Sequence, residues 1–314
     1  MLAYSLQRIA LALLICTVAI TALISIIHII PGDPVNIVLG PRATQEMREN
    51  YRREMGMDQP VPIQILHFLG KAAIGDLGKD MWSKRPVATV VVETLPYTLS
   101  LIAAGLGWAI ILGVPLGCYS AVRRNSAIDK LTGVISVGTI SIPSFVVAIY
   151  SMLLFAVTLN WFPAIGAGDR GDLTDLAHHL VLPAFAMGLG WVGYLARLVR
   201  ASMLEIMGEH HVRTARAFGL RERSIIFRYA LRIAILPTIT LISLAFGTLL
   251  SSAVFTEVIF ARPGIGKLVV DAVNFRNYPV VMGAVFITVA LFAFGTMLAD
   301  LLIARLDPRV RSSL

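Results

Sequence analysis

Residues 209–237 read EHHVRTARAFGLRERSIIFRYALRIAILP, and the rest of the chain is arranged around this stretch. It is the largest basic insertion in a strongly apolar sequence, and it holds six of the 27 Lys and Arg residues. It lies between two apolar runs, 180–196 and 233–254. A basic segment between apolar runs is typical of a loop on the cytoplasmic side of a membrane. The stretch therefore predicts a membrane protein in which spanning helices alternate with polar loops.

Within this stretch the order of residues predicts a helix, a bend and a second helix. Good helix formers occupy 212–218, and Gly219 suits the left-handed conformation that ends many helices. The second helix should begin near Ser224 and continue into the next span. Small residues keep the bend narrow enough for another protein to approach its backbone: Ala215, Ala217 and Gly219. We interpret the bend as a docking element, with a purely topogenic role of its arginines as the alternative.

The composition excludes a soluble domain. Of 314 residues, 57% are hydrophobic and 15% charged, and the mean hydropathy is +0.77. The net charge of +8 fits arginine-rich cytoplasmic loops, so no nucleic-acid partner is expected. Cys16 and Cys118 both lie inside apolar segments, which indicates neither a disulfide framework nor a metal or redox site.

Six apolar runs are long enough to cross a bilayer whose hydrocarbon core is about 30 Å thick. They are 9–30, 95–120, 131–159, 180–196, 233–254 and 280–299. The sequence thus predicts an all-α polytopic membrane protein with six transmembrane helices. The expected divisions are a first helix (1–30), an extracytoplasmic region (31–94), a five-helix core (95–304) containing a cytoplasmic loop (201–232), and a cytoplasmic tail (305–314).

The region 31–94 has its own pattern. PGDP at 31–34 predicts a rigid turn at the membrane exit. Thr44 is placed to cap a polar helix. A second, semi-apolar helix should follow Pro60 and Pro62 and lie along the membrane surface or against the spans.

Flanking charges give the orientation of the spans. With the N-terminus inside, the inner segments carry 15 basic and 6 acidic residues, whereas the outer segments carry 12 basic and 13 acidic residues. Because short basic loops stay in the cytoplasm, both termini are expected there.

Four of the six spans contain a proline inside or near one end, and two of these prolines, Pro143 and Pro237, are candidate pathway or gate residues. A proline removes a backbone hydrogen bond and kinks a helix. Kinked helices can serve close packing or movement, and both interpretations stay open.

Motifs for enzymatic chemistry are absent from the sequence. It contains no HExxH, no GxSxG and no P-loop, so no catalytic residue, metal or cofactor is expected. If ATP powers this protein, another polypeptide binds it. Ionisable residues are nearly absent from the spans, which argues against an ion-coupled secondary transporter, the alternative from another class. Glu257, near a span end, is either a gate residue or a structural carboxylate.

Ten short motifs in the observed order resemble one family, the dipeptide, oligopeptide and nickel permeases of ABC importers. They are PGDP at 31, MGMDQPVPIQ at 55, GDLG at 75, TLPYTLSL at 94, SIPSF at 141, RLVRASMLE at 197, RTARAFGL at 213, EVIFARPGIGKL at 257, NYPVV at 277 and DPRVR at 307. The resemblance spans nearly the whole chain. It implies the type I ABC importer permease fold.

The resemblance also implies partners and a docking site. It implies a second homologous permease subunit, two ATPase subunits and an extracytoplasmic solute-binding protein, all at the bacterial inner membrane and in contact with membrane lipid. The residues that would engage the ATPase are Arg213, Thr214, Ala215, Arg216, Ala217, Gly219 and Leu220. The wider superfamily has Glu-Ala-Ala at the start of this loop, where this chain has Arg213-Thr214-Ala215, a departure that is similar to the peptide and nickel branch.

The substrate stays open among the compounds that this family carries. Di- and oligopeptides are the leading interpretation, with nickel chelates, glutathione-like compounds, opines and oligosaccharides as alternatives. In this family the binding protein carries most of the selectivity.

The charge bias generates a topology prediction. A reporter that is active only outside the cytoplasm should be active when fused at residue 70 and inactive when fused at residue 215. A pair of fusions that reported the same side would contradict the orientation.

Overall fold

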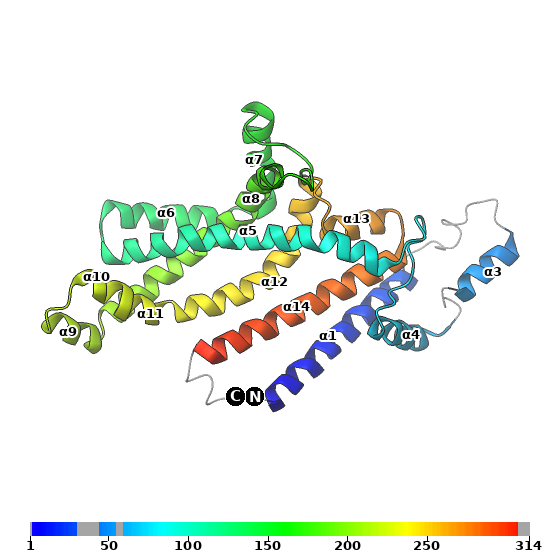
Figure 1. Ribbon diagram of the computed structural model, residues 1–314, viewed down its shortest axis with the longest axis horizontal. Coiled ribbons are helices and arrows are strands. Elements are labelled where there is room, and N and C mark those ends of the chain that lie inside the picture. The colour runs from blue at the N-terminus through cyan, green and yellow to red at the C-terminus, as the bar shows by residue number, and fades with distance from the viewer. Residues whose placement is uncertain (1, 30–43, 55–58, 307–314) are drawn as a thin grey trace. The chain divides into compact units, whose positions relative to one another are not determined.

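The structure is a computed structural model that describes residues 2–29, 44–54 and 59–306. The regular elements of these residues are helices (Figure 1). Contacts divide the chain into two compact units, which are described separately below. Unit 1 contains Met1–Pro96 and Pro263–Phe294, and unit 2 contains Tyr97–Arg262 and Gly295–Leu314.

Five helices in the described residues are long and apolar enough to cross a membrane, and a bent pair supplies a sixth candidate. The five are α1 (Leu2–Ile29), α5 (Val87–Val122), α8 (Leu173–Met207), α12 (Leu236–Ile259) and α14 (Tyr278–Leu306). Their existence was predicted from the apolar runs. Their ends were not, because α5 and α8 continue well past the apolar residues into polar sequence.

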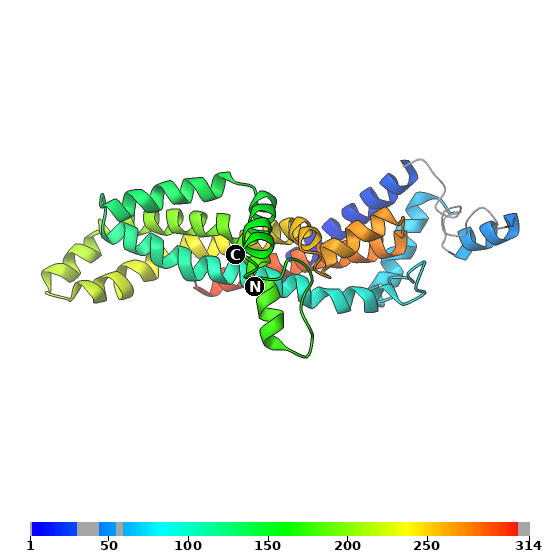
Figure 2. The ribbon, with the colours of Figure 1, turned by 90° about the horizontal axis from the view of Figure 1, so that it is seen from above.

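The third predicted span is broken at Pro143. The run 131–159 forms α6 (Ala127–Ser141), α7 (Ser144–Ser151) and the π-helical turn η1 (Met152–Thr158), with a bend of 97° between α6 and α7–η1 (Figure 2). Pro143 precedes α7 with an extended ψ of 140°, so its ring lies outside the helix interior. Pro183 lies inside α8, which continues through it. Sequence alone did not distinguish these two outcomes.

Small residues bring the backbones of α5 and α8 together in unit 2. On α5 they recur every four residues, at Gly105, Ala109, Gly113 and Gly117. A Cβ added to Gly117 would lie 2.4 Å from the carbonyl oxygen of Ala196 on α8. A Cβ added to Gly188 of α8 would lie 2.2 Å from the carbonyl oxygen of Gly105. Neither backbone can yield, so these glycines set the distance between the helices.

The indole N–H of Trp108 donates to the carbonyl oxygen of Ala184 at 2.7 Å, which adds a hydrogen bond across the same helix pair. On the other side of this pair, α12 closes a buried cluster in which Leu101 and Ile102 of α5 meet Leu249 and Ala253 of α12. The three helices α5, α8 and α12 therefore share one core.

A charged cluster of Asp129, Ser120 and Arg200, called the clasp below, joins α5, α6 and α8 at the C-terminal end of α5. The Asp129 carboxylate is 5% exposed and accepts hydrogen bonds from Ser120 Oγ, the Asn125 backbone N–H and the Arg200 guanidinium. The second bond from Arg200, Nη2 to Oδ2, measures 2.8 Å. The Arg200 side chain is 33% exposed, so the pair is only partly buried, but its two hydrogen bonds to Asp129 tie α8 to α6 near the C-terminal end of α8.

Unit 1 contains α1, the first part of α5, most of α14 and the short helices α3 (Gln45–Glu54), α4 (Val61–Ala73) and α13 (Ile265–Asn274). Thr44 Oγ1 accepts from the Met47 N–H at 3.3 Å, so the predicted cap of α3 is confirmed. The predicted second helix is α4, which packs against α1 and α14, with the Phe68 and Phe286 rings 5.9 Å apart. The predicted PGDP turn lies outside the described residues.

The α5–α8 contact generates a stability prediction. Gly117→Val should lower the free energy of unfolding by at least about 1–3 kcal/mol, because the new side chain meets backbone that cannot move away. The thermal midpoint of the detergent-solubilised protein measures this. Gly107→Val on the same helix is the matched control, since an added Cβ there meets nothing within 4 Å. Equal midpoints for the two variants would contradict the close-packing account.

Candidate functional site

The predicted docking element is a helical hairpin that follows α8 (Figure 1). It consists of α9 (His210–Ala217), α10 (Glu222–Ser224), the π-helical turn η2 (Ile225–Ala230) and α11 (Leu231–Ala234). Helix, bend and helix occur as predicted, and the second arm runs with one turn at Ile235 into α12.

The bend has the geometry that the glycine predicted. Gly219 has a φ of +76°, which is the left-handed region. Its N–H donates to Arg216 O at 2.9 Å, and the Leu220 N–H donates to Ala215 O at 3.2 Å. This pair of bonds is a Schellman motif, which satisfies the last carbonyl groups of α9. The bend is therefore held by backbone hydrogen bonds within the hairpin.

A small apolar core holds the two arms of the hairpin together. Val212 and Ala215 of α9 and Ile225 of η2 are buried, and Ile206 and Met207 of α8 pack against them. Ala215 was expected to keep the bend narrow enough for another protein to approach its backbone. It instead faces inward at 5% exposure, where its small side chain lets α9 approach η2.

The remaining predicted residues lie on the exposed side of the hairpin: Arg213, Thr214, Arg216, Ala217, Gly219 and Leu220. Among them projects Phe218, whose residue surface is 81% exposed. From the sequence, Phe218 was expected only to be a helix former. Its exposure could have been predicted from its place directly before a capping glycine in a basic loop, because nothing within the hairpin can cover a side chain at that position.

Arg216 braces the bend from outside. Its Nε donates to Glu222 Oε1 at 2.7 Å, so the ion pair bridges α9 and α10. Both side chains are exposed, and such a pair contributes about 0–1 kcal/mol. Arg216 therefore belongs to the hairpin's own structure as well as to its surface.

The break at Pro143 borders a hollow of about 180 Å³ in unit 2. Ile142 and Ser144, the neighbours of Pro143, line it. Residues of α8 and α12 complete the wall, among them the aromatic and hydroxyl side chains of Trp191, Tyr194, Thr248 and Ser252. Among the described side chains that line this hollow, the Tyr194 phenol is the one ionisable group.

Pro237 and Glu257 lie far from one another on α12. Pro237 is in the first turn of the helix, and Glu257 lies 20 residues later, about 30 Å along the axis. Glu257 is fully buried, and its Oε1 accepts from Thr98 Oγ1 of α5 at 2.6 Å. This contact gives Glu257 a packing role between α5 and α12, while its role as a gate stays a prediction.

Two arginines that no sequence motif singled out, Arg170 and Arg262, flank Tyr97 in unit 2. The Arg170 Nε donates to the Tyr97 hydroxyl at 2.7 Å, and the guanidinium carbons of Arg170 and Arg262 lie 5.4 and 5.6 Å from the ring centroid. Arg262 is 2% exposed and donates to Ser100 at 3.2 Å. Burial lowers the pKa of the Arg262 guanidinium, and the Glu257 carboxylate opposes that shift.

Comparison with known proteins assigns this arrangement to a family. The profile described as "Binding-protein-dependent transport system inner membrane component" matches residues 113–312, and the profile of its N-terminal part matches residues 1–102. The chain belongs to this family. It is therefore a multi-pass inner-membrane permease component of ABC importers, a non-enzymatic subunit that works with ATPase subunits.

Curated relatives align over most of this permease. A putative peptide permease protein of Brucella suis biovar 1 (strain 1330) is 37% identical over 317 residues, covering 99% of both chains. The glutathione transport system permease protein GsiC of Escherichia coli (strain K12) is 35% identical over 285 residues, covering 91% of both chains. GsiC of Pectobacterium atrosepticum is 36% identical over the same length, again covering 91% of both chains.

A solved structure shares the fold of this permease. A chain of the MetNI methionine ABC transporter in an inward-facing conformation aligns with a TM-score of 0.58 at 18% identity, covering 69% of this chain and 96% of that chain. The type I importer permease fold that the sequence motifs implied is confirmed.

The exposed bend generates a docking prediction. Gly219→Trp should leave membrane insertion near normal, because an added Cβ there meets nothing within 4 Å of this chain. The indole should instead fill the space that the partner occupies, and so abolish transport and ATPase co-purification. Gly219→Asn is the matched control, since asparagine tolerates the left-handed conformation. Normal uptake by the tryptophan variant, with the ATPase still bound, would place the docking element elsewhere.

Proposed function

We propose that this permease forms half of the translocation pathway of a di- or oligopeptide importer and that its hairpin, in the predicted cytoplasmic loop 201–232, transmits ATPase movement to the pathway. The observation that carries the proposal is the self-contained, capped hairpin, which holds an exposed Phe218 at its bend. A rigid element that presents a largely exposed aromatic side chain at its bend, among basic residues, has the features of an interface anchor.

Movement of the ATPase would reach the pathway through two covalent connections. The first arm of the hairpin continues α8, and the second arm continues into α12. Both α8 and α12 line the hollow beside Pro143. Displacing residues 213–220 would therefore shift both walls of the hollow, with Pro143 and the turn before Pro237 as points where the helices can change direction.

The lining of the hollow supports a broad rather than a selective passage. Its hydroxyl and aromatic side chains offer hydrogen bonds and apolar contact without a fixed charge. A peptide backbone can exchange hydrogen bonds with such groups whatever its side chains are. Selectivity would then lie in an extracytoplasmic solute-binding protein.

The relatives support peptides as the substrate class. One is named a putative peptide permease and others glutathione permeases, and glutathione is itself a small peptide. Nickel chelates, opines and oligosaccharides stay alternatives within the same importer class. The complete importer would contain this chain, a second homologous permease, two ATPase subunits and the binding protein, with both ends of this chain in the cytoplasm.

The function is tested in proteoliposomes that contain both permeases and both ATPase subunits. Uptake of a labelled tripeptide should require ATP and the binding protein, and this chain alone should hydrolyse no ATP. Phe218→Ala should weaken ATPase association roughly 30-fold, as expected for an anchor worth about 2 kcal/mol.

Phe275 provides a matched control, because it also follows the last residue of a short helix, α13, and is 63% exposed. Phe275→Ala should leave ATPase association unchanged. Uptake that stopped with an uncoupler but continued without ATP and binding protein would indicate an ion-coupled carrier instead.

A further inference from the structure

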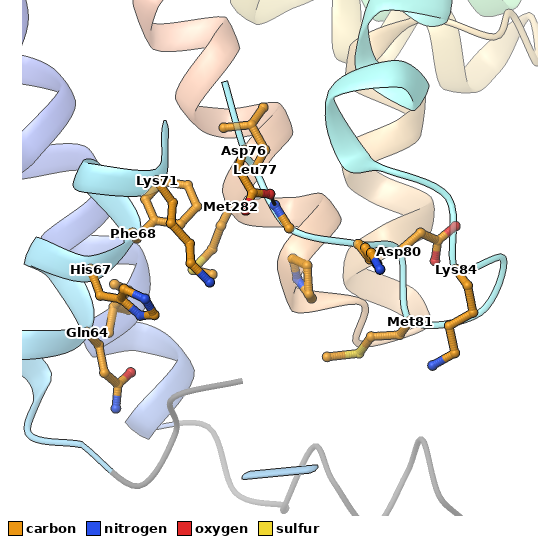
Figure 3. A pocket seen from close by; sticks show the side chains of 14 residues that line it. Gln64, His67, Phe68, Lys71, Asp76, Leu77, Asp80, Met81, Lys84 and Met282 are labelled. Atoms are coloured by element: carbon orange, nitrogen blue, oxygen red, sulfur yellow. Dashed lines mark hydrogen bonds between the residues drawn. The ribbon is translucent and has the colours of Figure 1, made fainter. Parts of the chain in front are cut away.

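Unit 1 contains a pocket of about 330 Å³ that the permease mechanism does not use (Figure 3). Its walls are α4, the segment 76–84 and the start of α14. In Figure 3, Lys71 and His67 project from α4 on one side, Lys84 lies at the opposite edge, and Met282 lies between them. The lining also contains apolar side chains, including Ile24, Phe68 and Leu77, and further polar and charged residues of the segment 76–84.

Lysines are concentrated at this pocket. The chain has five lysines and 22 arginines, and three of the five lysines line this one site: Lys71, Lys79 and Lys84. Among the described residues, the ammonium groups of Lys71 and Lys79 have no hydrogen-bond or ion-pair partner. The pocket therefore presents two ammonium groups, those of Lys71 and Lys79, that no described side chain pairs.

The two acidic residues of the lining hold the segment in place. Asp76 accepts from the Gly78 N–H at 2.9 Å. Asp80 accepts from Ser83, from the Trp82 N–H and from Asn277 Nδ2, the last at 2.6 Å. Burial raises the pKa of the Asp80 carboxyl, but these hydrogen bonds outweigh burial and hold the pKa below its usual value. Asp80 is thus an ionised anchor for the segment.

The pocket lies where two spanning helices of unit 1 end. Ile24 is five residues before the end of α1, and Pro279 and Met282 are in the first turns of α14. The ends of spanning helices lie at the level of the lipid headgroups. Lysines at this level attract anionic headgroups.

An apolar groove of about 400 Å³ adjoins the pocket within the same unit. Leu77 lines both, and the Phe68–Phe286 ring pair stands between them, since Phe68 lines the pocket and Phe286 the groove. The groove continues along α14 past Ala290 to Phe294, with the first part of α5 as its other wall.

The length of this combined site matches one leaflet of a bilayer. From Pro279 to Phe294, α14 rises about 22 Å at 1.5 Å per residue. Half of a bilayer, headgroups included, is about 20–22 Å. The pocket at one end carries the lysines, and the groove that makes up the rest of the site is lined by apolar side chains.

We propose that unit 1 binds one anionic phospholipid, with the phosphate at Lys71 and Lys79 and an acyl chain in the groove along α14. Under the orientation proposed above, the lipid belongs to the outer leaflet. A soluble phosphate would use only the basic end, and an acidic protein surface would use neither the apolar floor nor the groove. Because the basic pocket continues into the apolar groove, a lipid fits the site better than a soluble phosphate or an acidic protein surface does.

The test is native mass spectrometry of the assembled importer, released from mild detergent after incubation with one additive at a time. The additives are phosphatidylglycerol, phosphatidylcholine with the same acyl chains, and glycerol 3-phosphate. Phosphatidylglycerol should stay bound to the permease, whereas the other two should not. Lys71→Gln with Lys79→Gln should weaken its binding about 30-fold, roughly fivefold per lysine.

Ala290→Trp tests the groove independently of the charges, because it fills the acyl-chain path and should also release the lipid. The matched controls are Lys130→Gln, at an exposed lysine of α6, and Ala10→Trp, at an exposed alanine of α1. Both should retain the lipid.

Other outcomes overturn the proposal. Equal retention of both phospholipids removes the charge argument, and binding of glycerol 3-phosphate as tightly as the lipid indicates a soluble-phosphate site. Lysine variants that keep the lipid but lose stimulation by the binding protein indicate a protein-docking surface instead.

Discussion

The close approach of α5 and α8 is the constraint on which unit 2 depends. Glycines at the crossing let carbonyl oxygens of one helix lie where a side chain of the other would otherwise be. In a bilayer, lipid is as apolar as the helix surfaces, so burial of apolar area contributes little to association and contact distance decides it. The Asp129–Arg200 clasp then fixes the end of α8, from which the hairpin continues.

The hairpin combines local order with an exposed anchor. Its backbone cap, its three-residue apolar core and the Arg216–Glu222 bridge all lie within the hairpin and the end of α8, so its shape does not require the partner. A preorganised surface loses little conformational entropy when it binds. A force applied at Phe218 would also be passed to α8 and α12 rather than absorbed by the bend.

The two units use polar groups in different ways. In unit 2, the Asp129 and Glu257 carboxylates are buried and hydrogen-bonded between helices, where they fix the helices in place. In unit 1, Asp80 is hydrogen-bonded to its own segment and to Asn277, while Lys71 and Lys79 lack partners among the described residues. Buried charges need internal partners because water cannot reach them. Charges at the rim of a pocket can instead take their partner from outside the chain.

The sequence by itself determined the elements that depend on local chemistry. Apolar runs specify spans because backbone polar groups in lipid must be satisfied within a helix. Gly219 specified the bend because a left-handed residue without a Cβ avoids strain. Thr44 specified a helix cap because its hydroxyl reaches the free backbone N–H of Met47, three residues along the chain.

Only the tertiary structure decided which side of each element faces a neighbour. Ala215 faces inward and Phe218 faces outward. Pro143 marks a sharp break, whereas Pro183 lies within a continuous helix. Glu257 has its hydrogen-bond partner on α5. The tertiary structure also gathers three lysines from two segments around one pocket. These outcomes depend on contacts between residues distant in sequence, and helical spans that are apolar all round carry no periodic signal from which such contacts can be read.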